Sequence, residues 1–141
     1  MKNSKILIAT LAGGVVLFLL GWLLYGMVFS GFFKSQGGTA VGVDKDMADL
    51  QMHWIFLGNL AYGLFLSLLL GTWAKVTDLI AGIRVSVIAG FLVEANFGLV
   101  MHGTTNLMKM VGIIADVFVS AAMSGIAGAV IAYILLRKEK V

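Results

Sequence analysis

The chain has no cysteine and no proline, and only 12% of its 141 residues carry charge. Without cysteine it forms no disulfide, no thiolate metal site and no iron–sulfur ligation of its own. Without proline it lacks a residue that commonly breaks or kinks membrane helices, so its apolar segments are expected to form continuous helices. The charged fraction is far below that of a soluble domain.

Signature motifs of enzymes are also missing. The sequence holds no His-Glu-x-x-His, no Gly-x-Ser-x-Gly and no glycine-rich phosphate loop ending in lysine. The ten Lys and Arg residues stand at the ends of apolar segments and form no basic stripe interleaved with aromatic residues. These absences argue against an enzyme and against a nucleic-acid partner, and they predict no cofactor.

Four long apolar segments account for most of the chain. Hydrophobic residues make up 60% of the sequence, and a helix needs about 20 mainly apolar residues to cross a bilayer. Segments of this kind occupy approximately residues 6–29, 53–73, 85–102 and 110–136. We therefore predict an all-α fold: one transmembrane domain over residues 1–141, built as an integral membrane four-helix bundle in a lipid bilayer.

Small residues indicate how these spans pack. The fourth span has small-xxx-small spacing at Ala121, Gly125 and Ala129, and glycines recur in the first and third spans. Helices in lipid associate closely through such residues because lipid gives no hydrophobic drive between them. Spans one, three and four are therefore expected to pack through their small faces.

The basic residues are distributed unequally between the two ends of the spans. Seven lie on one side (Lys2, Lys5, Lys75, Arg84, Arg137, Lys138, Lys140) and three on the other (Lys34, Lys45, Lys109). Because cytoplasmic ends of membrane helices are enriched in Lys and Arg, we predict that both termini are cytoplasmic. The expected location is the inner membrane of a bacterium, as a multi-pass protein.

The first span carries a family resemblance. The start Lys5-Ile-Leu-Ile-Ala-Thr10, followed by Gly21-Trp22-Leu23-Leu24-Tyr25-Gly26, resembles the first thirty or so residues of small uncharacterised bacterial membrane proteins with about four spans. The resemblance implies a four-span inner-membrane protein, and it implies no particular activity.

Glu94 places a carboxyl group near the middle of the third span. An acidic residue at this depth costs roughly 2.5–3.5 kcal/mol on insertion, so it must face protein or water. Three interpretations remain open. In the first, Glu94 is protonated and donates a hydrogen bond to Asn59, Tyr62 or a backbone carbonyl. In the second, it relays a proton or cation in a wet cavity open to the outer side. In the third, it binds a basic or polar group from another subunit or partner.

Other polar residues share the outer half of the predicted bundle. Asn96 points about 200° from Glu94 around the helix, so the two cannot face one partner equally. Asp116 lies on the fourth span with Lys109 on the same face, seven residues earlier. That spacing suggests either that Lys109 neutralises Asp116 locally or that Asp116 sits near the outer interface.

Two histidines flank the same outer surface. His53 and His102, together with Glu94 or Asp116, have the ligand types of a divalent-metal site. Their spacing matches no recognised metal motif, and each also fits an ordinary position in the interfacial belt.

The sequence favours a non-enzymatic bundle that self-associates as a homo-oligomer or serves as an accessory subunit of another membrane protein, with Glu94 and Asn59 in a buried polar contact. One alternative is a small proton- or cation-coupled transporter or channel that uses Glu94, with Asp116 and the histidines as its outer vestibule. Another is a membrane enzyme that acts on a lipid or quinone, which requires a lateral opening beside the histidines and Glu94.

Overall fold

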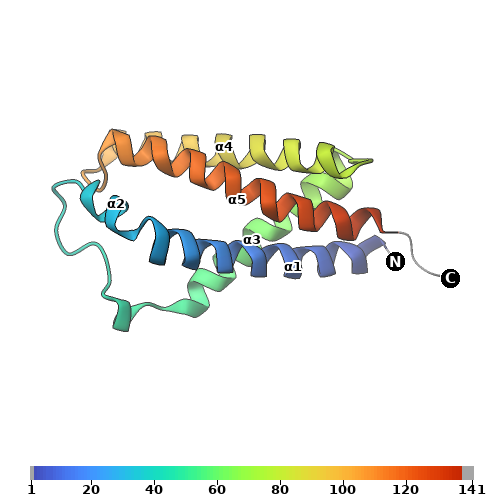
Figure 1. The fold of residues 1–141 in the computed structure, drawn as a ribbon, viewed down its shortest axis with the longest axis horizontal. Coiled ribbons are helices and arrows are strands. Elements are labelled where there is room, and N and C mark those ends of the chain that lie inside the picture. Colours follow the sequence, from blue (N-terminus) through green and yellow to red (C-terminus); the bar gives the residue numbers. More distant parts are fainter. Residues whose placement is uncertain (1, 138–141) are drawn as a thin grey trace.

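The computed structural model describes residues 2–137 and is all-helical apart from turns, loops and one isolated bridge (Figure 1). The α-helices are α1 (Lys2–Leu23), α2 (Ser30–Ser35), α3 (Met52–Leu68), α4 (Leu79–Thr104) and α5 (Met110–Leu136). Two π-helical turns, Leu24–Val28 and Leu69–Trp73, extend α1 and α3. The all-α prediction is confirmed, and four helices are long and apolar enough to cross a membrane.

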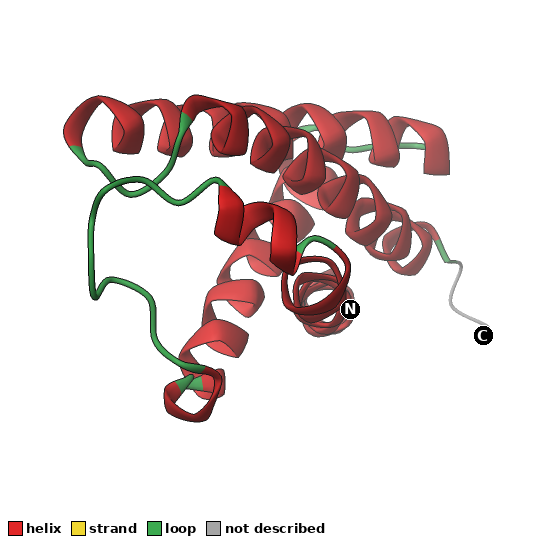
Figure 2. Cartoon of the chain, turned by 60° about the vertical axis from the view of Figure 1, so that its left-hand side comes forward, coloured by secondary structure: helices red, strands yellow, loops and turns green. Residues whose placement is uncertain are grey.

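The helices pack in the order α4, α5, α1, α3 (Figure 1). α3 crosses α1 obliquely, and its first half lies apart from α4 and α5 (Figure 2). The two chain ends lie together at one end of the molecule, where Lys5 Nζ donates a hydrogen bond of 2.7 Å to the carbonyl of Arg137. The bundle is therefore closed at the end that carries the termini and open between α1 and α3 at the other.

Glycine and serine allow α4 and α5 to approach closely. A methyl group added at Gly90 would lie 2.1 Å from Ser124 Oγ, and one added at Gly128 would lie 2.1 Å from Ser86 Oγ. These distances leave no room for a larger side chain at either glycine. The predicted packing of spans three and four through their small faces is therefore confirmed.

α1 packs on α3 through a second glycine contact. A methyl group at Gly63 of α3 would lie 2.8 Å from both the amide nitrogen of Gly14 and the carbonyl oxygen of Thr10. The sequence pattern predicted packing through the small faces of spans one, three and four. In the structure the second span takes part as well, because its Gly63 receives the backbone of α1.

α4 begins earlier than the hydropathy pattern indicated. Asp78 Oδ1 accepts a hydrogen bond of 2.8 Å from the amide of Ala81, which caps the helix. The helix starts at Leu79 instead of near residue 85. Its first turn is stabilised by this cap, which supplies an acceptor for an otherwise unpaired amide.

The long loop after α2 is held against the connector between α4 and α5. Gly38 N donates to the carbonyl of Leu107 at 2.9 Å, and Ala40 N donates to the carbonyl of Asn106 at 3.1 Å. In the opposite direction, Lys109 N donates to the carbonyl of Gln36 at 2.8 Å. The loop therefore folds across the ends of α4 and α5 (Figure 2).

Candidate functional site

Two acidic side chains meet between α4 and α5. Glu94 and Asp116 are both partly buried, and their carboxyl groups lie close enough to interact. Ser120, one helical turn beyond Asp116 on α5, donates a hydrogen bond of 3.4 Å from Oγ to Glu94 Oε2. Together with Tyr25, these residues form what we call the acid cluster.

Tyr25 connects α1 to this cluster. Its hydroxyl donates a hydrogen bond to Asp116 Oδ1, and its ring packs against Phe33 with centroids 5.1 Å apart. Tyr25 lies in the π-helical turn Leu24–Val28, which continues α1 so that the span Asn3–Val28 is one uninterrupted helix. π-helical turns are frequent at functional sites. A buried tyrosine hydroxyl normally requires a hydrogen-bond partner, and for Tyr25 that partner is Asp116.

Lys109 does not neutralise Asp116. Its Nζ donates instead to the carbonyl of Ser35 at 3.2 Å, which ties α2 to the start of α5. The suggested pairing of Lys109 with Asp116 is therefore wrong. Asp116 is partnered by Tyr25 and Glu94, and its charge is left without a basic neighbour in these contacts.

The other polar residues singled out in the sequence lie elsewhere. Asn59 Nδ2 donates to the carbonyl of Ile55 on its own helix at 2.8 Å. The Tyr62 hydroxyl lies 2.9 Å from the Oγ of Ser124, which follows Ser120 by one helical turn on α5. Asn96 is exposed on the outside of α4. The structure thus brings Glu94 together with Asp116, and Ser120 donates a hydrogen bond to Glu94. The predicted polar contact between Glu94 and Asn59 is not formed.

A cavity of about 300 Å³ opens onto the acid cluster. Its wall is mostly apolar, and the loop after α2 closes one side of it through Gly37 and Val43. We call it the vestibule; its polar and charged lining residues are Asp44, Glu94, His102, Thr105 and Asp116. Among the described residues that line it, the charged ones are all acidic, so the vestibule favours positively charged species.

The two histidines are not brought together as metal ligands. His102 lines the vestibule, and its Nδ1 lies 3.2 Å from the carbonyl oxygen of Met108. His53 packs against the neighbouring Trp54 near the start of α3. This part of α3 lies apart from α4 and α5 (Figure 1). Within residues 2–137, no three His, Cys, Asp or Glu side chains gather in a way that could hold a metal ion.

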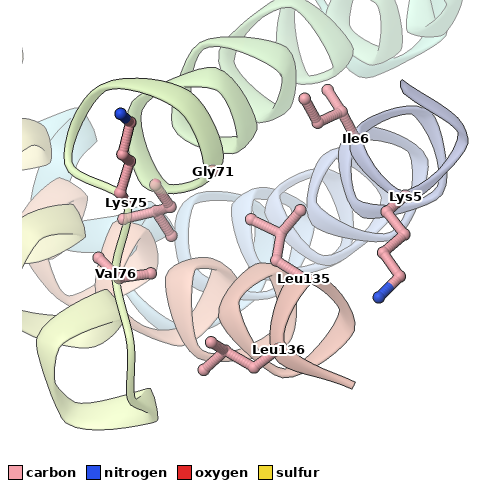
Figure 3. A pocket seen from close by; sticks show the side chains of 8 residues that line it. Lys5, Ile6, Gly71, Lys75, Val76, Leu135 and Leu136 are labelled. Carbon is pink, nitrogen blue, oxygen red and sulfur yellow. The ribbon is translucent and has the colours of Figure 1, made fainter. Parts of the chain in front are cut away.

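Other cavities lie outside the cluster. An apolar groove of about 420 Å³ between α1 and the first half of α3 has Tyr25 and Asn59 in its wall. It is a lateral opening, but neither histidine nor Glu94 lines it. A smaller pocket of about 200 Å³ lies at the end that carries the termini, where the amino groups of Lys5 and Lys75 point away from one another (Figure 3).

No family model, curated protein or solved structure matches this chain. The resemblance of the first span therefore goes no further than four apolar helices. With no relative to supply an activity, the acid cluster and its vestibule are the features from which a function can be argued.

Proposed function

We propose that the protein binds a proton or a small monovalent cation in the vestibule, at Glu94 and Asp116, as a step in transporting it across a membrane. The observation that carries the proposal is the meeting of two carboxyl groups inside a bundle of apolar helices, beside a cavity whose charged lining is acidic. Acidic residues at membrane depth often mark ion pathways because they are costly to keep there.

The chemistry of the pair supports binding of a positive species. Two carboxylates in contact repel each other, so the pair is most stable with a proton or a cation between them. Ser120 and Tyr25 each donate to one carboxyl oxygen, Glu94 Oε2 and Asp116 Oδ1 respectively. In the proposal, Glu94 Oε1 and Asp116 Oδ2 hold the proton or cation, while the two hydroxyls fix the carboxyl groups in place.

Polar groups continue along α5 beyond the acid cluster, which favours passage over static binding. The positions follow at intervals of four residues: Asp116, Ser120, Ser124 with Tyr62, and Gly128 against Ser86. Each interval advances about 6 Å along the helix. The Ser86 hydroxyl is fully buried and has no hydrogen-bond partner among the described residues. Such a group is available to a proton or water that passes beyond Ser124.

The orientation that fits this proposal has the vestibule on the outer side and both termini in the cytoplasm of a bacterium. It is supported by the excess of Lys and Arg at the end that carries the termini. Two residues in that count, Lys138 and Lys140, lie outside the described residues. The bacterial inner membrane and a role as an accessory subunit stay predictions, as does an enzyme acting on a lipid or quinone.

Purified protein in liposomes tests the proposal. With a pH-sensitive dye inside and a membrane potential imposed, we expect proton entry faster than in protein-free liposomes; Na⁺ and K⁺ uptake are measured in parallel. Glu94→Gln keeps the size and hydrogen bonding of the side chain but cannot ionise. Both Glu94→Gln and Asp116→Asn should reduce the flux to that of protein-free liposomes.

Asp49→Asn is the matched control, because Asp49 is an exposed acid in the loop and does not line the vestibule. It should leave the flux unchanged. A wild-type protein that moves neither protons nor Na⁺ nor K⁺, or a flux that persists in both vestibule variants, would contradict the proposal.

A further inference from the structure

We infer that the outer face of α4 centred on Asn96 is the surface through which two copies of this chain associate. Asn96 lies eight residues before the end of α4 at Thr104. That is about 12 Å along the helix axis, well inside an apolar span. The vestibule lies on the other side of α4, so this surface is independent of the proposed transport site.

Asn96 is exposed, and among the described residues its side-chain amide makes no hydrogen bond. Its situation differs from that of Asn59, whose amide is bonded to its own helix at Ile55. Transfer of an unpaired amide to an apolar medium is costly. Asparagine side chains in membrane helices therefore hydrogen-bond across helix–helix interfaces.

The residues around Asn96 repeat every seven positions, as in a two-stranded coiled coil. Leu92 and Leu99 lie seven residues apart on either side of Asn96, and Gly103 lies seven residues after it. Toward the start of α4, Val85 and Ala89 continue these two rows but are partly buried against the bundle's own core, so the open face runs from Leu92 to Gly103. Leu92 and Leu99 are 60% and 56% exposed. The sevenfold spacing keeps this face in contact with a partner helix over about three helical turns, from Leu92 to Gly103, and Asn96 lies within that stretch.

The chemistry of the amide selects a second copy as the partner. Asparagine has both a donor and an acceptor, so two Asn96 side chains related by a twofold axis satisfy each other. The small residues in the same row allow close approach: a methyl group added at Gly103 would meet no atom within 4 Å. An asparagine in such a row is known to fix the register of paired helices.

Cysteine cross-linking tests the surface directly, because the chain has no cysteine of its own. Leu99→Cys places a thiol on the proposed interface. Leu19→Cys places one at a similarly exposed position of α1, 54% exposed against 56%. In liposomes at a low protein-to-lipid ratio, oxidation should give a disulfide-linked dimer from Leu99→Cys and monomer from Leu19→Cys.

Fluorescence energy transfer between two labelled populations then measures the role of the amide. Asn96→Leu should raise the dimer dissociation constant about 3-fold to 30-fold, the range expected for a hydrogen bond between membrane helices. Asn96→Gln, which keeps the donor and acceptor, should restore most of the affinity. Asn59→Leu should leave the dissociation constant unchanged.

The inference is overturned if Leu19→Cys cross-links as readily as Leu99→Cys, if the wild-type chain is monomeric by energy transfer, or if Asn96→Leu associates as tightly as the wild type. Leu19, Asn96 and Leu99 are exposed and Asn59 is partly buried, so thermal unfolding of each variant verifies that the folded monomer is intact.

Discussion

At the scale of single residues, Tyr25 links the acid cluster to the rest of the bundle. Its hydroxyl is the contact through which α1 holds Asp116 of α5, and its ring also forms part of the apolar groove toward α3. One side chain therefore lines the groove and also bonds to Asp116, a residue of the vestibule. Removing its hydroxyl tests whether this hydrogen bond holds the site together.

We expect Tyr25→Phe to lower the free energy of unfolding by about 1–2 kcal/mol, because it leaves Asp116 without its donor while keeping the ring in place. Thermal unfolding in detergent micelles measures the change. Tyr133→Phe is the control: Tyr133 lies on α5 and is 62% exposed. Equal stability of the two variants would show that the hydroxyl of Tyr25 adds nothing to the fold.

The sequence predicted at this scale that Glu94 would need a partner, because the cost of a carboxyl group in lipid is independent of the fold. Which partner it has depends on how each helix is rotated about its axis. Asn59, the suggested partner, is satisfied by Ile55 on its own helix, and Ser120 was available one turn from Asp116. The hydrophobic periodicity of the sequence does not show whether Glu94 faces Asn59 or Ser120.

At the scale of helices, glycine decides which faces touch. α4 and α5 meet through Gly90 and Gly128, and α1 meets α3 through Gly14 and Gly63. The first contact was predictable, since small residues are dense in the fourth span. The second was not, because Gly58 and Gly63 both occur in α3 and the sequence does not tell which of them faces α1.

These two glycines provide a matched pair. We expect Gly63→Ala to destabilise the fold by about 1–3 kcal/mol, because the added methyl group meets the backbone of α1, which cannot move aside locally. Gly58→Ala meets no atom within 4 Å and should be neutral or stabilising by up to about 1 kcal/mol through helix propensity. Unfolding in a denaturing detergent compares the two variants, and a larger loss at Gly58 would contradict the packing of α1 on α3.

Some helix ends can be predicted from the sequence and others cannot. The capping side chain of Asp78 is a local signal for the start of α4, whereas the hydropathy pattern placed that start several residues late. The π-helical turns at Leu24–Val28 and Leu69–Trp73 have no local signal such as proline. They arise where α1 and α3 end, and the first of them carries Tyr25.

At the scale of the whole molecule, the order α4, α5, α1, α3 places the end of α1 beside the acid pair and leaves the first half of α3 splayed away (Figure 1). Hydropathy predicts the number of spans but gives no information on this order. The order explains why Tyr25 joins the cluster and Asn59 does not. It also leaves the vestibule to be closed by the loop after α2 instead of by a fourth helix.

That closure depends on Gly38. A methyl group there would lie 2.0 Å from the carbonyl oxygen of Asn106, which belongs to the backbone that the loop pairs with. We therefore expect Gly38→Ala to detach the loop and to raise hydrogen exchange at the amides of Ala40 and Lys109, whose bonds of 3.1 Å and 2.8 Å join loop and connector. Gly31→Ala, where a methyl group meets no atom within 4 Å, should leave both amides protected. Because the helices do not depend on these bonds, global unfolding should change little, so unchanged exchange in Gly38→Ala would mean that the loop is not held by this pairing.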